Sequence, residues 1–316
     1  MHALLACCGA EIPSAKASFR QLARYHYTHA VAGLRNNLND GLLQDRWVVV
    51  LLTIMMLCIY ERSKPSGSSG VETHLAGAAR LIQLVSRSYT VRLQGTGIEP
   101  AMQHLVRESF IFHVTTSLPF HDEDFYNGEI EAALALAEEA ISQHFGSRYF
   151  AHLDSPVLGF PPQLFRCIYT VYRLYRVSDR AQIDPEIWQR MDGSLCQWDE
   201  RIMATMEGLA DITSSGPRLY ILGCRILLRR MSPSGLPALS LSLLVQEGME
   251  IVGRLQPAQD YYADYYCWPF LVLGMNLGRT PDRDLLMRQV EAFGAATNNG
   301  TMRRLGDMLR IYWEGH

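Results

Sequence analysis

Four tyrosines and a tryptophan gather in the segment YYADYYCWPFLVLG, residues 261–274. Two of the tyrosines are followed by another tyrosine four positions later, so on a helix the rings form two adjacent stripes. Buried phenol groups need hydrogen-bond partners, which favours a ligand-lined cavity over a dry core. We therefore predict a pocket wall in this segment, made of Tyr262, Tyr265, Tyr266 and Trp268. The Trp268-Pro269 step is expected to kink or restart the helix beside it.

We expect the pocket to lie between this segment and the early helices, with His26 and His113 as candidate hydrogen-bond donors to its ligand. His26 and His29 also have the three-residue spacing that can place two metal ligands on one helical face. No Asp or Glu lies within the next turn to complete a metal site, so no metal is predicted. The seven cysteines contain no CxxC pair, which excludes a zinc module of that type, and we expect reduced, mostly buried thiols.

Other motifs give no catalytic constellation. The acidic run Asp122, Glu123 and Asp124 is similar to the cluster with which class I terpene cyclases hold magnesium diphosphate, but the second metal motif of that family has no match downstream. Carboxylates before a helix more often favour the helix dipole. The GTG at 95–97 lacks the third glycine and the preceding strand of a dinucleotide fingerprint. We predict no cofactor.

Composition restricts the partners. The 316 residues carry a net charge of −3, so no overall field draws the chain to nucleic acid or to an anionic membrane. The strongest apolar run, residues 47–60, is shorter than the roughly 20 residues that a spanning helix needs. We expect this run to be a helix buried on all sides, and we expect no membrane contact and no direct nucleic-acid contact.

Apolar residues recur at three- and four-residue spacing along most of the chain, and alternating strand-like runs are nearly absent. The predicted fold class is all-α, a single multi-helix domain over residues 1–316 with an exposed Pro-, Gly- and Ser-rich loop near 63–72. Helices are expected across 18–40, 47–60, 71–89, 101–118, 129–145, 162–177, 184–209, 215–231, 238–255, 261–274, 281–296 and 299–314.

A series of segments in a particular order resembles the fungal-specific transcription factor domain, the helical regulatory region of Zn(II)2Cys6 regulators. In the first, His29 or His26 is followed by Ala30 and Leu34-Arg35; a helix ending in Tyr60-Glu61 follows, and then His74, Gly77 and Ala78. The remaining segments are MHALLACCGAEI, DSPVLGFPPQLF, YYCWPFLVLG and MRRLGDMLRIYWE.

The resemblance implies an all-helical scaffold that senses metabolites or partner proteins in the nucleus, often as a homodimer. The six-cysteine cluster, the basic linker and the coiled coil of the family have no counterpart in the sequence. We therefore expect either a regulator fragment without its own DNA-binding module or a stand-alone protein, nuclear or cytoplasmic. The expected partners are an apolar metabolite and either a second copy or a transcriptional partner protein.

A stand-alone chain leaves two further functions open. One is a binding or co-regulatory protein. The other is a cofactor-independent enzyme of fungal secondary metabolism, a cyclase or Diels-Alder-type pericyclase acting on an apolar terpenoid or polyketide. Such reactions need only a folded substrate and a few placed donors, and the chain has 15 Tyr, 13 Met, 11 Phe and 5 Trp with which to shape a cavity.

Overall fold

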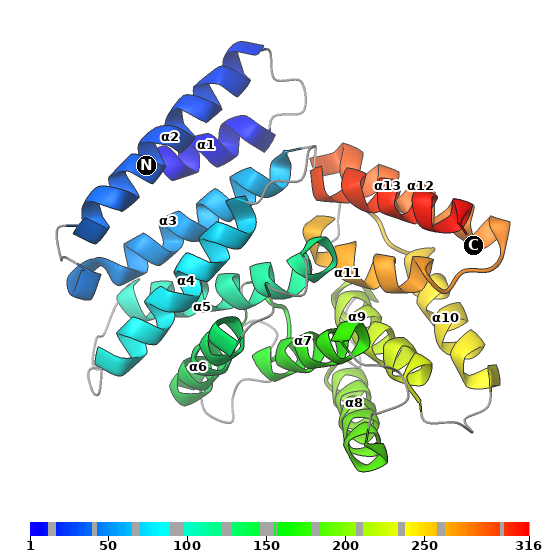
Figure 1. The fold of residues 1–316 in the computed structure, drawn as a ribbon. Helices are drawn as coiled ribbons and strands as arrows, with labels where there is room; N and C mark the ends of the chain where they lie inside the picture. Colours follow the sequence, from blue (N-terminus) through cyan, green and yellow to red (C-terminus); the bar gives the residue numbers. More distant parts are fainter. Residues whose placement is uncertain are drawn as a thin grey trace. The chain divides into compact units, whose positions relative to one another are not determined.

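Helices make up nearly all of the structure. The computed structural model describes residues 1–11, 17–39, 43–64, 70–88, 98–121, 125, 128–145, 155, 157–177, 184–206, 211–232, 238–257, 263–297 and 300–315. Within these ranges the chain forms 13 α-helices and one 3-10 turn and contains no strand (Figure 1). The predicted all-α class is therefore confirmed. The centre of the predicted exposed loop, residues 65–69, lies outside the described residues.

Contacts group the chain into two compact units. The first contains residues Met1–Val114 and Phe120–Pro162, and the second contains Thr115–Pro119 and Gln163–His316. The predicted single domain over 1–316 stays a prediction, and the two units are described separately below.

The first unit is built from six helices. They are α1 (His2–Glu11), α2 (Ala17–Asn39), α3 (Leu43–Ser63), α4 (Gly70–Ser88), α5 (Ile98–Ser117, whose last three residues belong to the second unit) and α6 (Gly128–Phe145). Helix α1 packs on α2 and α3, α3 packs on α4, and α4 packs on α6. Gly9 allows the first of these contacts, because a Cβ atom at that position would lie 3.0 Å from the Cβ of Ala23.

Helix α3 contains the strongest apolar run and packs against α1, α2 and α4. Leu51, Leu57 and Cys58 are fully buried by these contacts. Val49 is nevertheless 62% exposed, so the prediction of a helix buried on all sides is wrong at this position. The neighbouring helices cover only part of the circumference of α3, and an apolar sequence does not show which part stays uncovered.

A buried glutamate anchors the segment just before the helix that begins at Pro162. Glu108 on α5 accepts hydrogen bonds from the backbone N–H groups of Val157 (3.0 Å) and Leu158 (3.4 Å). In the same segment, the hydroxyl oxygen of Ser155 accepts a hydrogen bond from the backbone N–H of Gly159 at 3.0 Å. Gly159 has a φ of 70°, a conformation that suits glycine. This acid therefore has a structural task in one of the segments that resemble the regulatory family.

The second unit contains a 3-10 turn (Leu118–Pro119, continuing to Phe120) and seven helices. The helices are α7 (Pro162–Val177), α8 (Pro185–Met206), α9 (Asp211–Arg230), α10 (Ala238–Val252), α11 (Ala263–Gly274), α12 (Thr280–Thr297) and α13 (Gly300–Glu314). Helix α9 contacts α8, α10 and α11, and α11 also contacts α12 and α13. Pro162 starts α7 as predicted, because proline at a first helical position leaves no further backbone N–H unsatisfied.

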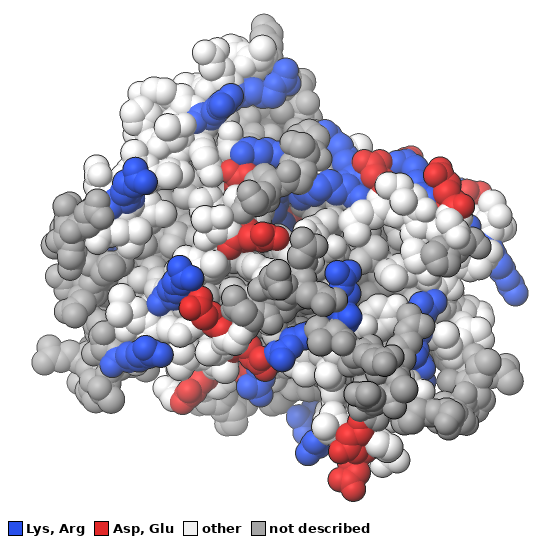
Figure 2. Space-filling view, in the orientation of Figure 1, with Lys and Arg blue, Asp and Glu red and all other residues white. Residues whose placement is uncertain are grey.

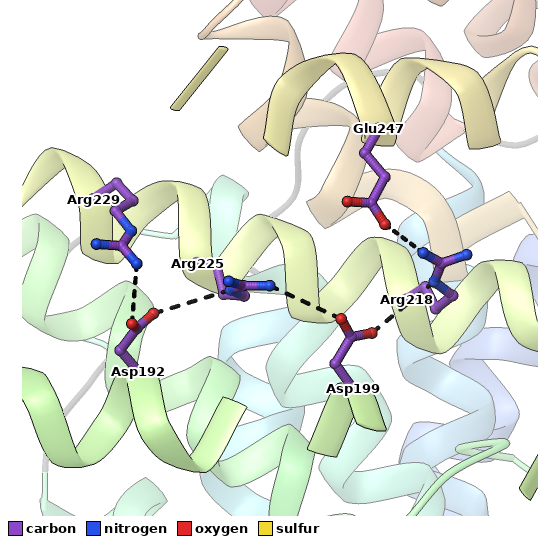
Figure 3. A network of polar contacts seen from close by, with 6 residues as sticks. All are labelled: Asp192, Asp199, Arg218, Arg225, Arg229 and Glu247. Atoms are coloured by element: carbon purple, nitrogen blue, oxygen red, sulfur yellow. Dashed lines mark hydrogen bonds and ion pairs between the residues drawn. The ribbon is translucent and has the colours of Figure 1, made fainter. Parts of the chain in front are cut away.

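Alternating charges join α8, α9 and α10 (Figure 3). Arg229 donates to Asp192 at 3.1 Å, while Arg225 lies between Asp192 (4.0 Å) and Asp199 (3.9 Å). Arg218 continues the series with Asp199 and with Glu247 of α10. The six residues are 16 to 39% exposed, so water screens the network only in part.

Candidate functional site

Three of the four predicted pocket-wall residues lie together in α11, and each is at most 1% exposed. The indole of Trp268 stacks on the ring of Tyr220 of α9, with centroids 5.6 Å apart and planes 6° from parallel. The ring of Tyr265 meets the same Tyr220 ring edge-on at 5.2 Å, and Tyr266 lies 5.0 Å from Phe293 of α12. Tyr262 lies outside the described residues.

Two glycines of α9 make room for these rings. A Cβ atom at Gly216 would lie 2.5 Å from the ring of Tyr265, and one at Gly223 would lie 2.6 Å from the indole of Trp268. Both distances are shorter than any real Cβ contact, so α9 and α11 can approach this closely only with glycine at both positions. The described rings therefore pack against a surface that fits them, and their role as a pocket wall stays a prediction.

Helix α11 runs through Pro269 from Ala263 to Gly274 without a break. The helix therefore does not restart at Trp268-Pro269, and the expected kink there stays a prediction. Proline has no N–H to donate to the carbonyl four residues earlier, which is that of Tyr265. The hydroxyl of Tyr220 donates to this carbonyl at 2.6 Å and so replaces the missing helical hydrogen bond.

The candidate donor His26 lies on α2, in the first unit, beside two other histidines. Its Nδ1 is 2.8 Å from Nδ1 of His2, and the ring of His29 stacks on His2 with centroids 5.2 Å apart. Partial desolvation and the neighbouring histidines lower the pKa of His2 below its ordinary value. Within the described residues, no group of three or more His, Cys, Asp or Glu has an arrangement that could hold a metal ion.

The candidate donor His113 is buried on α5, also in the first unit. Arg62 of α3 donates from Nη1 to its Nδ1 at 3.2 Å, which places the proton of the neutral ring on Nε2. Burial, reinforced by the charge of Arg62, lowers the pKa of His113 well below 6.5. The ring is therefore neutral at pH 7, and Nε2 is the atom with which it could donate.

A polar cluster of the first unit joins residues that the sequence did not connect. Lys64 contacts both carboxylate oxygens of Glu61 at 2.8 Å, and its Nζ lies 4.8 Å from the ring centroid of Tyr60. The ring of Tyr27 stacks on Tyr60 at 4.5 Å, and its hydroxyl lies 3.1 Å from Nε2 of His74. The cluster therefore unites the Tyr60-Glu61 and His74 segments of the resemblance with a tyrosine from α2.

Burial determines the charge states in this cluster. Desolvation and then Glu61 raise the pKa of both Tyr27 and Tyr60, while desolvation lowers the pKa of His74. Both phenols and the imidazole are therefore neutral at pH 7. Glu61 is only 3% exposed, and Lys64 supplies its countercharge. A buried carboxylate with a paired cation is stable in place, but losing either partner is costly.

The cysteines agree with the expectation of reduced thiols. All seven are free, and Cys7, Cys58, Cys224 and Cys267 are buried, whereas Cys8 is exposed. Burial raises the pKa of Cys58 and Cys224 above the ordinary thiol value, so these thiols stay protonated.

A pocket of about 220 Å³ opens among α1, α2 and α3 in the first unit. Its apolar lining includes Ala3, Ala30, Leu34 and Val50. Its polar lining includes His2, His29, Asn37, Arg46 and Thr53. Small side chains leave this space: a Cβ atom at Gly33, which also lines the pocket, would find no atom within 4 Å. The sequence predicted a pocket between residues 261–274 and the early helices and not one among α1, α2 and α3, and that pocket stays a prediction.

On the face drawn in Figure 2, Lys and Arg side chains are interspersed with Asp and Glu over the described residues. The net charge of the full sequence is −3. The expectation that the chain does not contact nucleic acid directly stays a prediction. No helix among the described residues is both long and apolar enough to cross a membrane.

The sequence model of one protein family, described as the fungal specific transcription factor domain, matches residues 1–315. The match covers almost the whole sequence, and the chain therefore belongs to this family. No curated protein and no solved structure gives a significant match.

Proposed function

We propose that this chain is the regulatory domain of a fungal Zn(II)2Cys6-type transcription regulator, one that senses an apolar metabolite and contacts a transcriptional partner protein. DNA binding is then supplied by another module or another protein. Membership of the transcription factor domain family supports the assignment to transcription. The same proposal places the protein in the nucleus.

The observation that carries the sensing role is the pocket among α1, α2 and α3. Ala3 and Ala30 line it and also form one buried cluster with Leu57, against which Leu34 and Tyr27 pack. Tyr27 in turn touches Tyr60 and His74. A ligand in the pocket would therefore contact residues that pack with Tyr27, a member of the polar cluster.

Ligand binding at this place would act first on stability. The pocket is lined by residues of three helices, so an occupant fixes α1 and α2 against α3. A ligand that binds only the folded state at 100 times its dissociation constant stabilises that state by about 2.7 kcal/mol. A ligand that prefers one of two folded populations by the same free energy shifts their ratio about 100-fold.

A reporter assay tests the proposal. The chain is fused to an unrelated DNA-binding domain in a fungal host and compared with two variants, Gly33→Met and Gly193→Met. Gly33 lines the pocket; Gly193 is an exposed glycine of α8 that likewise has no atom within 4 Å of a Cβ. We expect Gly33→Met to change reporter output severalfold and Gly193→Met to leave it unchanged. Output equal to that of the DNA-binding domain alone, across all growth conditions, would overturn the regulatory role.

The cyclase alternative stays a prediction, and no observation on the described residues favours it over the regulatory role. Incubating the purified chain with apolar terpenoid or polyketide intermediates tests it directly. A rate above that in buffer would support the enzyme.

A further inference from the structure

We propose that the pocket among α1, α2 and α3 takes a small apolar monocarboxylate, whose carboxylate pairs with Arg46 while its tail lies against the alanine and valine wall. This inference rests on the proposed sensing function and names the chemical class of its ligand.

The charge of the lining favours an anion. None of the 12 lining residues is acidic, and Arg46 is the one lining side chain with a permanent charge. Within the described part of the chain Arg46 has no ion pair and no hydrogen bond, so its guanidinium is available to a ligand. A guanidinium can bind a carboxylate through two parallel hydrogen bonds, an arrangement that a neutral ligand cannot form.

Two other polar side chains of the lining already donate hydrogen bonds within their own helices. The Asn37 amide donates to the carbonyl of Gly33 at 2.9 Å, and the Thr53 hydroxyl donates to that of Val49 at 2.8 Å. Each bond lies within a single helix, so the Thr53 hydroxyl donor is engaged, while Asn37 keeps its second amide N–H. His29 and His2 add imidazole nitrogens on the same lining and become attractive to an anion when protonated.

Volume sets the size of the ligand. The 220 Å³ pocket equals the space of about seven waters at roughly 30 Å³ each, which corresponds to a ligand of about ten non-hydrogen atoms. A ligand of this size binds with a dissociation constant on the order of 0.1 mM. Because Ala3, Ala30, Leu34 and Val50 offer no hydrogen-bonding side chain, a second polar group on the tail would lose water without gaining a partner.

Calorimetric titration of the full chain with octanoate and with octan-1-ol tests the class. The two probes have the same apolar tail and differ in charge. We expect octanoate to bind at least tenfold more tightly than octan-1-ol. Equal affinity for both probes would overturn the proposal. No binding of octanoate up to about 5 mM, which is about fifty times the expected dissociation constant, would also overturn it.

Two pairs of variants locate the site. Arg46→Gln should weaken octanoate binding about tenfold and leave octan-1-ol unaffected, whereas Arg35→Gln, an exposed arginine of α2 outside the pocket lining, should change neither. Gly33→Met should abolish binding of both probes, while Gly193→Met should preserve it. Circular dichroism confirms that each variant is folded. Unchanged octanoate affinity in Arg46→Gln or in Gly33→Met refutes the assigned site.

The two proposals can fail separately. If octanoate does not bind but Gly33→Met still changes the reporter output, the ligand class is wrong and the sensing role stands. If octanoate binds as expected but the reporter is silent, the pocket is a carboxylate site and the regulatory role is wrong.

Discussion

The helices around α11 and those around the α1–α3 pocket fill space differently. Around α11, large rings lie against glycines, and a Cβ atom at Gly223 would collide with Trp268 at 2.6 Å. Around the pocket, alanines and valines leave a gap, and a Cβ atom at Gly33 would meet nothing within 4 Å. A cluster of rings can therefore mark a well-filled core, while free volume collects where three helices meet through short side chains.

Replacing Trp268 with alanine is the strongest test of the filled region. The side chain is fully buried and stacks on Tyr220, so Trp268→Ala should lower the free energy of unfolding by about 3–5 kcal/mol. Urea denaturation measures the loss, with Trp198→Ala, a partly exposed indole on α8, as the control of smaller effect. A loss below about 1 kcal/mol at Trp268 would favour the predicted ligand cavity over a packed core.

Alanine at the two contrasting glycines should act in opposite directions. Gly223→Ala places a methyl group where it overlaps the Trp268 ring and should destabilise the protein by about 1–3 kcal/mol. Gly33→Ala extends into open space within α2 and should stabilise it by about 0.5–1 kcal/mol. Thermal unfolding of both variants checks the signs. The same sign at both sites would erase the difference between the two regions.

The bond between Tyr220 and the Tyr265 carbonyl predicts a coupling within the filled region. Tyr220→Phe removes this donor to the buried carbonyl and should cost about 1–2 kcal/mol. In a Pro269→Ala background the restored backbone N–H can serve the carbonyl, so the same change should cost less. A double-mutant cycle by urea denaturation measures the coupling. Equal costs in both backgrounds would show that the hydroxyl does not replace the helical bond.

The first unit should respond to pH through His113. The pKa of His113 is about 6.5 in the unfolded chain and well below that in the folded chain. At a pH between the two pKa values, the unfolded chain therefore binds a proton that the folded chain does not. Stability is therefore highest above pH 6.5 and falls as pH decreases through that value. Urea denaturation at pH 8 and pH 5.5 measures the loss. His113→Gln, which keeps an acceptor for Arg62, should remove this part of it, and an undiminished loss would assign the effect to other groups.

The ionic network of Figure 3 should give the smallest effects. Asp192→Asn weakens contacts to Arg225 and Arg229 and should cost about 1 kcal/mol, because both partners are partly shielded from water. Arg80→Gln removes an exposed pair with Glu129 and should cost less than about 0.5 kcal/mol. Thermal unfolding of both variants at low and high salt distinguishes the two contributions, because salt screens an exposed ion pair more than a shielded one. A larger loss at Arg80 would contradict the assignment of the network to a shielded site.

Hydrophobic periodicity predicted most of the helices, because a repeating apolar face is a local property of the chain. The course of α11 could not be read in this way. Pro269 signals a break locally, and the donor that replaces its missing hydrogen bond comes from Tyr220, 45 positions before the accepting Tyr265. The exposure of Val49 was equally hidden, since it depends on which neighbours cover α3.

The candidate site was predictable only in part. Tyr265, Tyr266 and Trp268 come together because they share one short helix, as their spacing indicated. The α1–α3 pocket was missed because a cavity depends on the distance between helices, which no spacing along the chain encodes. Gly33 and Arg46 were the local signals, a glycine inside a helix and a cation bordering an apolar run, and neither is specific without the packing.

The hydrogen bond from Tyr220 to the Tyr265 carbonyl limits the order in which evolution can exchange two residues. A lineage that first loses Pro269 regains a backbone donor and is then free to change the tyrosine. A lineage that first loses Tyr220 passes through a destabilised intermediate. Among relatives, we expect phenylalanine at position 220 mainly where position 269 is no longer proline.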